Sequence, residues 1–321
     1  MKAARTMKAS SDQMPSVSYL QRMIAFAVVV GFLWLLWGPG SPLSRTKPAT
    51  NDPSISDSAS TREEVALTPR VASLSPAITD SLVQLGLAKH IVGRSAYCRA
   101  VDANVPVVGD LRDFDAERLA LLKPDFLFVQ PPLAGVDPAL RALCETNHIT
   151  LLARRLDSLH DLRLLVDDIA LAFDVNDETS AQSDIRAAIA SAREGLVEPI
   201  ALTADAPRVL LVVSTDPFLI VGSNTYLDEF MRGSGFANVL QRSGYVELGA
   251  EAIVALAPAT VIAISSTKDG AMRMSEVLRA LPWDAANTPR VSTAAVPELL
   301  TPSLVAVAHR DALARLAAGT P

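Results

Sequence analysis

The pattern of apolar and polar positions divides the chain into three kinds of segment. Residues 23–37 form an unbroken apolar run. Residues 41–68 are rich in Ser, Thr, Pro, Asp and Asn, a composition that cannot build a core and predicts a flexible tether. From residue 69 onward, short apolar runs alternate with segments whose apolar residues recur at helical spacing. This alternation predicts a globular α/β part.

The globular part contains two halves that begin alike. In the first half, the apolar run 70–74 predicts a strand, and Thr79 is expected to open a helix that ends near Gly86. In the second half, the apolar run 208–213 is followed by a loop and by a helix predicted over 225–235. Each half therefore reads as strand, helix, strand, helix, strand, which predicts two similar lobes with mainly parallel sheets flanked by helices.

A short motif with a glutamate also occurs once in each half. Glu117 and Glu251 each open a predicted helix that stops near a proline and leads into a buried strand. A carboxylate in the first turn suits the helix dipole, which alone explains either glutamate. Because the motif recurs in both lobes, it predicts a partner that binds the protein at two sites, one on each lobe.

The segment between the lobes has helical character. Residues 158–197 contain no proline and, apart from Gly195, no glycine. Leu159, Leu162 and Ile169 lie on one apolar face, and a second helix follows a break near residues 174–177. We expect a long, rigid helical connection, assigned to residues 174–200, that limits hinge motion.

The amino-terminal region carries an export signal. Lys2, Arg5, Lys8 and Arg22 precede the apolar run, which predicts a cytoplasmic amino terminus and export of everything downstream. The run is about 22 Å long at 1.5 Å per residue, and residues 38–43 extend it toward a full span. Pro39 makes a poor cleavage site, so an uncleaved signal anchor is favoured over a removed signal peptide. The predicted organisation is 1–18 cytoplasmic, 19–40 membrane or signal helix, 41–68 linker, 69–173 first lobe, 174–200 connecting helix and 201–321 second lobe.

Composition and motifs exclude several functions. The net charge is −6 without a basic patch, so nucleic acid is not an expected partner. The chain has no G-x-S-x-G, P-loop or H-E-x-x-H motif, which argues against an enzyme. The four histidines are not at ligand spacing, so no dedicated metal site is expected. Cys98 and Cys144 lie outside any C-x-x-C pair, and spacing alone leaves their pairing open.

Three segments carry a resemblance to a known family: 70–76 with Thr79, 92–98 and 117–125. From residue 69 onward the chain resembles the helical-backbone (class III) periplasmic binding proteins that deliver vitamin B12, haem or ferric siderophores to ABC transporters, and it is most similar to the B12-binding branch. The resemblance implies a monomeric binding domain without a cofactor of its own, and a cobalt corrinoid or iron chelate as ligand. It also implies a permease dimer with its ATPase as partner, on the periplasmic side of the inner membrane.

The resemblance also assigns roles to individual residues. Glu117 and Glu251 match the glutamates that dock the two lobes onto permease arginines. The ligand contacts that it implies are Tyr97, Phe218 and Tyr245. Their places in loops at predicted strand ends are where open α/β sheets bind ligands.

Other cleft positions leave the ligand open. Arg94 and Arg112 lie near the predicted cleft, where they could bind an anionic group of the ligand. Leu111 and Gln130 stand where the B12 branch has tryptophans, and its late acidic residue is replaced near residues 294–295. A ferric siderophore or haem carrier is therefore the first alternative. A membrane-tethered sensor or scaffold without transport is an alternative of another class.

Overall fold

The computed structural model describes residues 69–175, 183–196 and 201–319, which belong to one compact unit. The predicted membrane or signal helix 19–40 and the linker 41–68 lie outside the described residues. Within these ranges, no helix is both long enough and apolar enough to cross a membrane.

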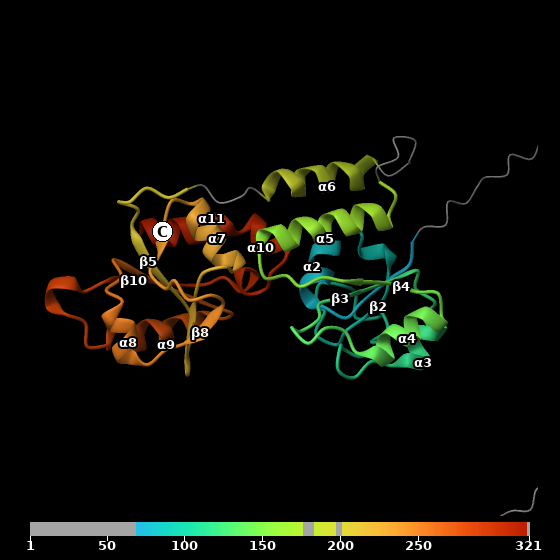
Figure 1. Cartoon of the computed structure of the whole chain (residues 1–321), viewed down its shortest axis with the longest axis horizontal. Coiled ribbons are helices and arrows are strands. Elements are labelled where there is room, and N and C mark those ends of the chain that lie inside the picture. Colours follow the sequence, from blue (N-terminus) through green and yellow to red (C-terminus); the bar gives the residue numbers. More distant parts are fainter. Residues whose placement is uncertain (1–68, 176–182, 197–200, 320–321) are drawn as a thin grey trace, which may run out of the picture. The chain divides into compact units, whose positions relative to one another are not determined.

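The first lobe is built on a four-stranded parallel sheet (Figure 1). Its strands stand in the order β2-β1-β3-β4. The elements are β1 (Val71–Ser73), α2 (Pro76–Gln84), η1 (Ala88–His90), β2 (Ile91–Arg94), α3 (Ala116–Leu122), β3 (Phe126–Val129), α4 (Pro138–Thr146) and β4 (Thr150–Ala153). The predicted parallel α/β lobe is confirmed here.

Helix α2 begins one turn earlier than the sequence analysis predicted. Ser75 is its N-cap and accepts a hydrogen bond from the Ile78 amide, and Pro76 occupies the first turn. A proline fits there because its missing N–H would have no partner in the helix anyway. Thr79, the expected start, is buried inside the helix and donates to the Ser75 carbonyl.

The second lobe has a six-stranded mixed sheet. The strand order is β10-β9-β5-β6-β8, with β7 beside β5. The elements are β5 (Arg208–Thr215), β6 (Phe218–Val221), α7 (Tyr226–Gly233), β7 (Ala237–Asn238), β8 (Tyr245–Glu247), α8 (Ala250–Ala255), β9 (Thr260–Ser265), α9 (Lys268–Arg279), η2 (Ala285–Asn287) and β10 (Arg290–Ala295). Strands β5, β7, β9 and β10 pair in parallel, which confirms the prediction of a mainly parallel sheet, whereas β6 is antiparallel to both β5 and β8. The loop expected after β5 is a tight hairpin turn instead.

Two helices, α5 (Leu159–Ala172) and α6 (Ser183–Gly195), follow β4 and pack against each other (Figure 1). The described residues therefore contain two helices, as the predicted break near residues 174–177 implies, and α6 lies within the predicted connecting segment 174–200. The apolar face predicted for α5 is confirmed, because Leu159, Leu162 and Ile169 are all buried. A capping box of Ser158 and Asp161 fixes the start of α5.

The carboxyl-terminal segment contacts both lobes. It consists of η3 (Pro297–Leu300), α10 (Leu304–Ala308) and α11 (Arg310–Ala318). Helix α10 packs against α2 of the first lobe, and its Leu304 amide donates to the Ser81 hydroxyl at 3.1 Å. Helix α11 then packs against β9, β10 and α7 of the second lobe.

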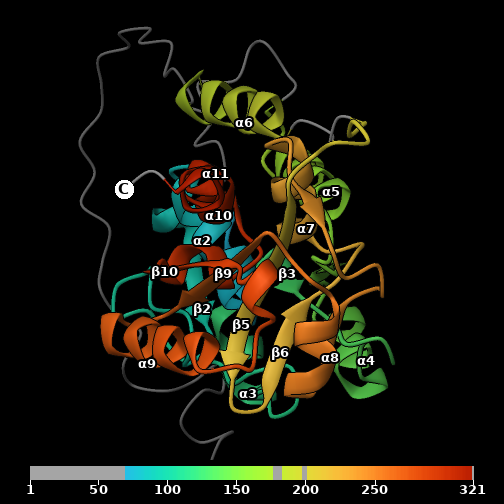
Figure 2. The ribbon, with the colours of Figure 1, turned by 90° about the vertical axis from the view of Figure 1, so that its left-hand side faces the viewer.

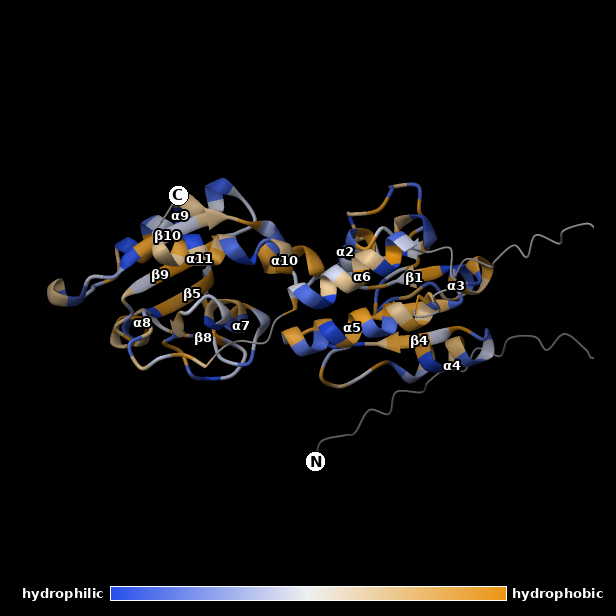
Figure 3. Cartoon of the chain, turned by 90° about the horizontal axis from the view of Figure 1, so that it is seen from above, coloured by the Kyte–Doolittle hydropathy of each residue, from blue (hydrophilic) through white to orange (hydrophobic). Residues whose placement is uncertain are grey.

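Both faces of the central strands are buried. In β5, Val209 and Leu211 face one core cluster and Leu210 and Val212 face another, as the two-residue period of a strand requires. Figure 2 shows α7 and α11 on one side of this sheet and α8 and α9 on the other. Figure 3 shows how strongly apolar β5 and β9 are.

One core cluster, called the shared core below, joins the two lobes. It includes Phe128 and Leu165 from the first lobe and Leu211, Phe230 and Leu304 from the later part of the chain. All of these side chains are nearly or fully buried. The lobes therefore meet through apolar packing as well as through the chain that connects them.

Candidate ligand-binding site

Polar residues gather at the carboxyl edge of the first sheet. Ser75 lies just beyond β1, Gln130 directly follows β3, and Arg155 and Asp157 lie just beyond β4. Because the carboxyl ends of parallel strands meet at one edge, these residues become neighbours. The Ser75 hydroxyl donates to the Gln130 side-chain oxygen at 3.0 Å.

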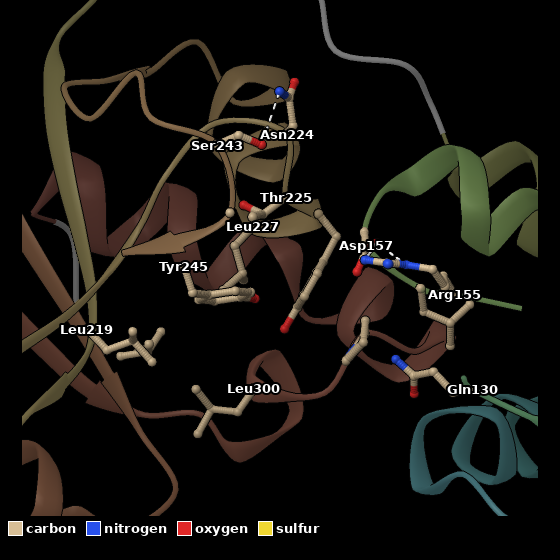
Figure 4. Close-up of a pocket in the computed structure, with 15 residues that line it drawn as sticks. Gln130, Arg155, Asp157, Leu219, Asn224, Thr225, Leu227, Ser243, Tyr245 and Leu300 are labelled. Atoms are coloured by element: carbon tan, nitrogen blue, oxygen red, sulfur yellow. Dashed lines mark hydrogen bonds and ion pairs between the residues drawn. The ribbon is translucent and has the colours of Figure 1, made fainter. Parts of the chain in front are cut away.

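This edge borders a cavity of about 710 Å³ to which both lobes contribute (Figure 4). The volume lies within the range of about 300–1,000 Å³ that is typical of small-molecule sites. The residues that line it are Gln130, Arg155, Leu156, Asp157, Val213, Leu219, Asn224, Thr225, Tyr226, Leu227, Ser243, Gly244, Tyr245, Leu300 and Pro302.

The cavity has two unlike walls. Figure 4 shows Tyr245, Leu219 and Leu300 on one side, and Gln130, Arg155 and Asp157 on the other. The first wall offers an aromatic ring and aliphatic side chains to an apolar surface. The second wall offers an amide and a pair of opposite charges. Such a cavity can hold a ligand that has an apolar face and a polar edge.

Two tyrosines of the second lobe differ in their access to the cavity. Tyr226 is 2% exposed, and its hydroxyl donates to the Leu299 carbonyl at 2.8 Å. Tyr245 is 46% exposed and can contact a ligand. Burial raises the pKa of both tyrosines, and the negative charge of Asp157 also raises that of Tyr245. Both phenols therefore remain protonated at neutral pH.

Arg155 and Asp157 form an ion pair on the polar wall. The Arg155 Nε and Nη2 groups both donate to one oxygen of Asp157, Oδ2, with Nε at 2.8 Å. The backbone of Asp157 is fixed separately, because its amide donates to Asp161 and its carbonyl accepts the Tyr226 amide at 2.7 Å. The pair therefore stands at the point where the two lobes touch.

The structure separates Tyr97 from Tyr245. Tyr97 is 66% exposed and lines a second cavity of about 410 Å³, together with Pro76, Asp80 and Pro297. This second cavity lies beyond the carboxyl end of β1, as Pro76 directly follows the cap of α2. The two predicted ligand tyrosines thus belong to different hollows.

Three other predicted ligand residues do not line the 710 Å³ cavity. Phe218 packs against a core cluster of the second lobe, and the next residue, Leu219, lines the cavity instead. The Arg94 guanidinium donates to four backbone carbonyls, of which those of Val105 and Ser95 lie at 3.1 and 3.2 Å. Arg94 therefore holds the loop after β2 together. Arg112 is exposed in a turn, where its amide donates to Asp110.

The sequence analysis missed Arg155, Asp157 and Tyr226. A usable signal existed for the first two, because they follow the short apolar run that forms β4, and ligands bind beyond the carboxyl ends of such strands. Tyr226 directly follows Thr225, the cap of α7, so its neighbourhood was also recognisable.

The helices that carry the two predicted docking glutamates are structural repeats. Glu117 lies in the first turn of α3 and Glu251 in the first turn of α8, and both are exposed. Two residues later, Leu119 and Ile253 are fully buried. A left-handed residue with φ of 44° follows each helix: Lys123 is the C-cap of α3, and Ala257 comes directly after Leu256, the C-cap of α8. Neither glutamate carboxylate has a partner among the residues that the structure describes.

The cysteine pairing that the sequence left open does not form. Cys98 and Cys144 are free and buried. Burial raises the pKa of both thiols, which makes them unreactive at neutral pH. No group of three or more His, Cys, Asp or Glu residues in the described ranges is arranged to hold a metal ion.

Comparison with known families decides the class. The family described as periplasmic binding protein matches residues 71–291, which include the first sheet, most of the second sheet and most of the residues that line the cavity. The chain belongs to the periplasmic binding protein family. As a periplasmic binding protein of ABC transporters it captures a substrate and does not transform it, in agreement with the sequence analysis.

Solved structures support the same fold. The haem-binding periplasmic protein of Pseudomonas aeruginosa is 23% identical with a TM-score of 0.55, over 79% of this chain and 92% of that one. The vitamin B12-binding protein BtuF of Vibrio cholerae is 17% identical with a TM-score of 0.58, over 78% and 97%. The haem-binding protein HutB of Vibrio cholerae is 20% identical with a TM-score of 0.57, over 77% and 98%. No curated protein sequence matches the chain. At these identities the likeness establishes the fold.

Proposed function

We propose that this periplasmic binding protein captures a large metal chelate, in the first place a cobalt corrinoid, and delivers it to an ABC permease dimer with its ATPase. The observation that supports this most is the 710 Å³ cavity between an aromatic wall and a polar wall. A flat macrocycle would lie on Tyr245 and bury its apolar face there. Its polar edge would face Gln130, Arg155 and Asp157.

A corrinoid suits the polar wall because its edge carries neutral amide groups. The wall presents the Gln130 amide and an ion pair whose charges cancel. A ferric siderophore or haem is the second candidate. It is favoured by the absence of the tryptophans that the B12-binding branch has at the positions of Leu111 and Gln130.

The ligand proposal is tested by titration calorimetry of the full chain with cyanocobalamin, cobinamide, haemin and a ferric hydroxamate siderophore. We expect tight one-to-one binding of a corrinoid and a loss of about tenfold or more in Tyr245→Ala, which removes a buried aromatic contact. Leu171→Ala is the matched control, since Leu171 is exposed on α5 outside the cavity. Failure of all four ligands to bind, or equal affinities for both variants, would refute the proposal.

For docking, we infer that Glu117 and Glu251 bind basic residues of the permease. Two exposed carboxylates without partners, on matched helices of the two lobes, are suited to steer and orient such an encounter. Lysine at both positions should abolish uptake while ligand affinity stays unchanged. The control replaces the exposed Glu145 and Glu276 by lysine. Normal uptake by the first double variant would contradict this docking role.

We further propose that residues 19–40 hold the protein on the periplasmic side of the inner membrane. The support is the apolar run behind a positively charged flank. Fractionation of cells that express the full chain tests this, because a tethered protein sediments with the membranes and keeps its amino terminus. Recovery of a shortened protein in the soluble periplasmic fraction would instead establish cleavage.

A further inference from the structure

Of the described residues that line the 710 Å³ cavity, two are charged: Arg155 and Asp157. Their exposed fractions are 41% and 53%, so the pair sits at the mouth, where a bound ligand would cover it. We propose that Asp157 is a specificity-determining residue of the cavity, an inference that rests on the proposed function. By occupying Arg155, Asp157 disfavours chelates with a carboxylate edge and leaves neutral, amide-edged chelates unaffected.

Asp157 occupies the side of the Arg155 guanidinium that a ligand carboxylate would use. Both Nε and Nη2 of Arg155, the edge that best matches a carboxylate, point at Oδ2 of Asp157. Figure 4 shows the pair joined by dashed lines, with the Gln130 amide nitrogen directed toward the same side. On this wall, the Arg155 Nη1 group and this amide nitrogen have no partner among the described residues, and the second Nη2 hydrogen also remains for a ligand.

Asp157 cannot easily move away from Arg155. Its amide donates to Asp161 in the capping box of α5, and its carbonyl accepts the Tyr226 amide at the start of α7. These backbone contacts hold the Asp157 carboxylate in front of Arg155 from both lobes. The neighbouring Arg154 is paired with Asp168, so it offers no second free cation.

A ligand carboxylate would compete with Asp157 for Arg155. A ligand carboxylate could use the Arg155 fork only by displacing the Asp157 carboxylate, and the two negative charges would then lie side by side. A ligand amide needs no displacement, because its oxygen can accept from Arg155 Nη1 or from Gln130, and its N–H can donate to Asp157 Oδ1. Selection of this kind works through an unfavourable contact with the wrong ligand.

The test measures the binding of cobinamide, haemin and haemin dimethyl ester to the full chain. The ester matches haemin in shape but lacks the two carboxylates. We expect the wild type to prefer the ester to haemin, and Asp157→Asn to raise haemin affinity about tenfold, since a hydrogen bond to a charged group then becomes available. Affinities for cobinamide and the ester should change no more than about twofold.

Two variants separate this effect from a general change of charge. Asp157→Asn combined with Arg155→Gln should lose the gain for haemin. Asp184→Asn, which removes an exposed negative charge from α6, should bind all three ligands like the wild type. A wild type that prefers haemin to its ester, or an equal response of both to Asp157→Asn, would overturn the proposal.

The outcomes also separate this inference from the proposed function. If the wild type binds cobinamide but Asp157→Asn gains nothing for haemin, the role of Asp157 is wrong and the carrier function stands. If neither the wild type nor any variant binds any of the three ligands, the proposed ligand class and this inference both fail.

Discussion

Replacing Tyr226 by phenylalanine should destabilise the protein measurably, although only one oxygen is removed. The Tyr226 hydroxyl donates to the Leu299 carbonyl at 2.8 Å, and both residues are nearly or fully buried. The ring itself stays packed edge-on against Phe230. A buried carbonyl that loses its donor costs about 1–3 kcal/mol, so we expect the free energy of unfolding to fall by about 2 kcal/mol. At about 2–4 °C per kcal/mol for a domain of this size, Tm should drop by about 4–8 °C.

The assay is urea denaturation together with thermal unfolding, both followed by circular dichroism. Tyr97→Phe is the matched control, because it removes the same atom from a side chain that is mostly exposed. The control should change the free energy of unfolding by less than about 0.5 kcal/mol. Equal midpoints for the two variants would show that the Leu299 carbonyl does not depend on Tyr226, and the reasoning would be refuted.

Further predictions concern a buried histidine, two left-handed glycines and the two thiols. Burial lowers the pKa of the His90 imidazole, so the unfolded chain binds a proton there more readily than the folded protein, and the free energy of unfolding should fall as pH drops below about 6.5. His90→Leu should flatten this fall when Tm is measured as a function of pH. Identical profiles for the variant and the wild type would argue against it. Gly109→Ala should lower the free energy of unfolding in urea clearly more than Gly135→Ala. A Cβ at Gly109 would lie 2.1 Å from the Asp113 carbonyl oxygen, whereas Gly135, at a similar φ, has open space. Equal losses of stability in the two variants would contradict this. Cys98 and Cys144 should resist a thiol reagent in the native protein and both react on unfolding, whereas rapid native labelling would speak against their burial.

The fold was predictable where one pattern allowed one structure. The spacing of Leu162 and Leu165 has only a helical reading, and both lie in the shared core. The prediction of helix and strand boundaries failed where a residue or a short run fits more than one structure. Thr79 was expected to open the first helix although Ser75 caps it and Pro76 starts it, and the short apolar run of β6 fits a strand or a loop until the turn before it is known. Turn geometry of this kind depends on contacts beyond the local pattern.

The site was harder to predict because single-residue register decides which side chains reach it. On β6, Phe218 faces a core and Leu219 the cavity, and no composition argument distinguishes these neighbours. Arg154 and Arg155 are likewise adjacent, yet one pairs with Asp168 and the other lines the cavity. The duplicated glutamates were easier to find, because repetition is visible in the sequence itself.

The contacts between the lobes also bear on how the protein folds. The Leu159 amide at the start of α5 donates to Glu229 of the second lobe at 2.6 Å, and the Leu304 amide at the start of α10 donates to Ser81 of the first. Each lobe thus supplies a hydrogen-bond acceptor for a first-turn amide of a helix that begins beside the other, and Leu159 and Leu304 themselves belong to the shared core. A half chain would expose helix ends and apolar surface together. The globular part should therefore unfold in one cooperative transition, with no stable species in which a single lobe is folded.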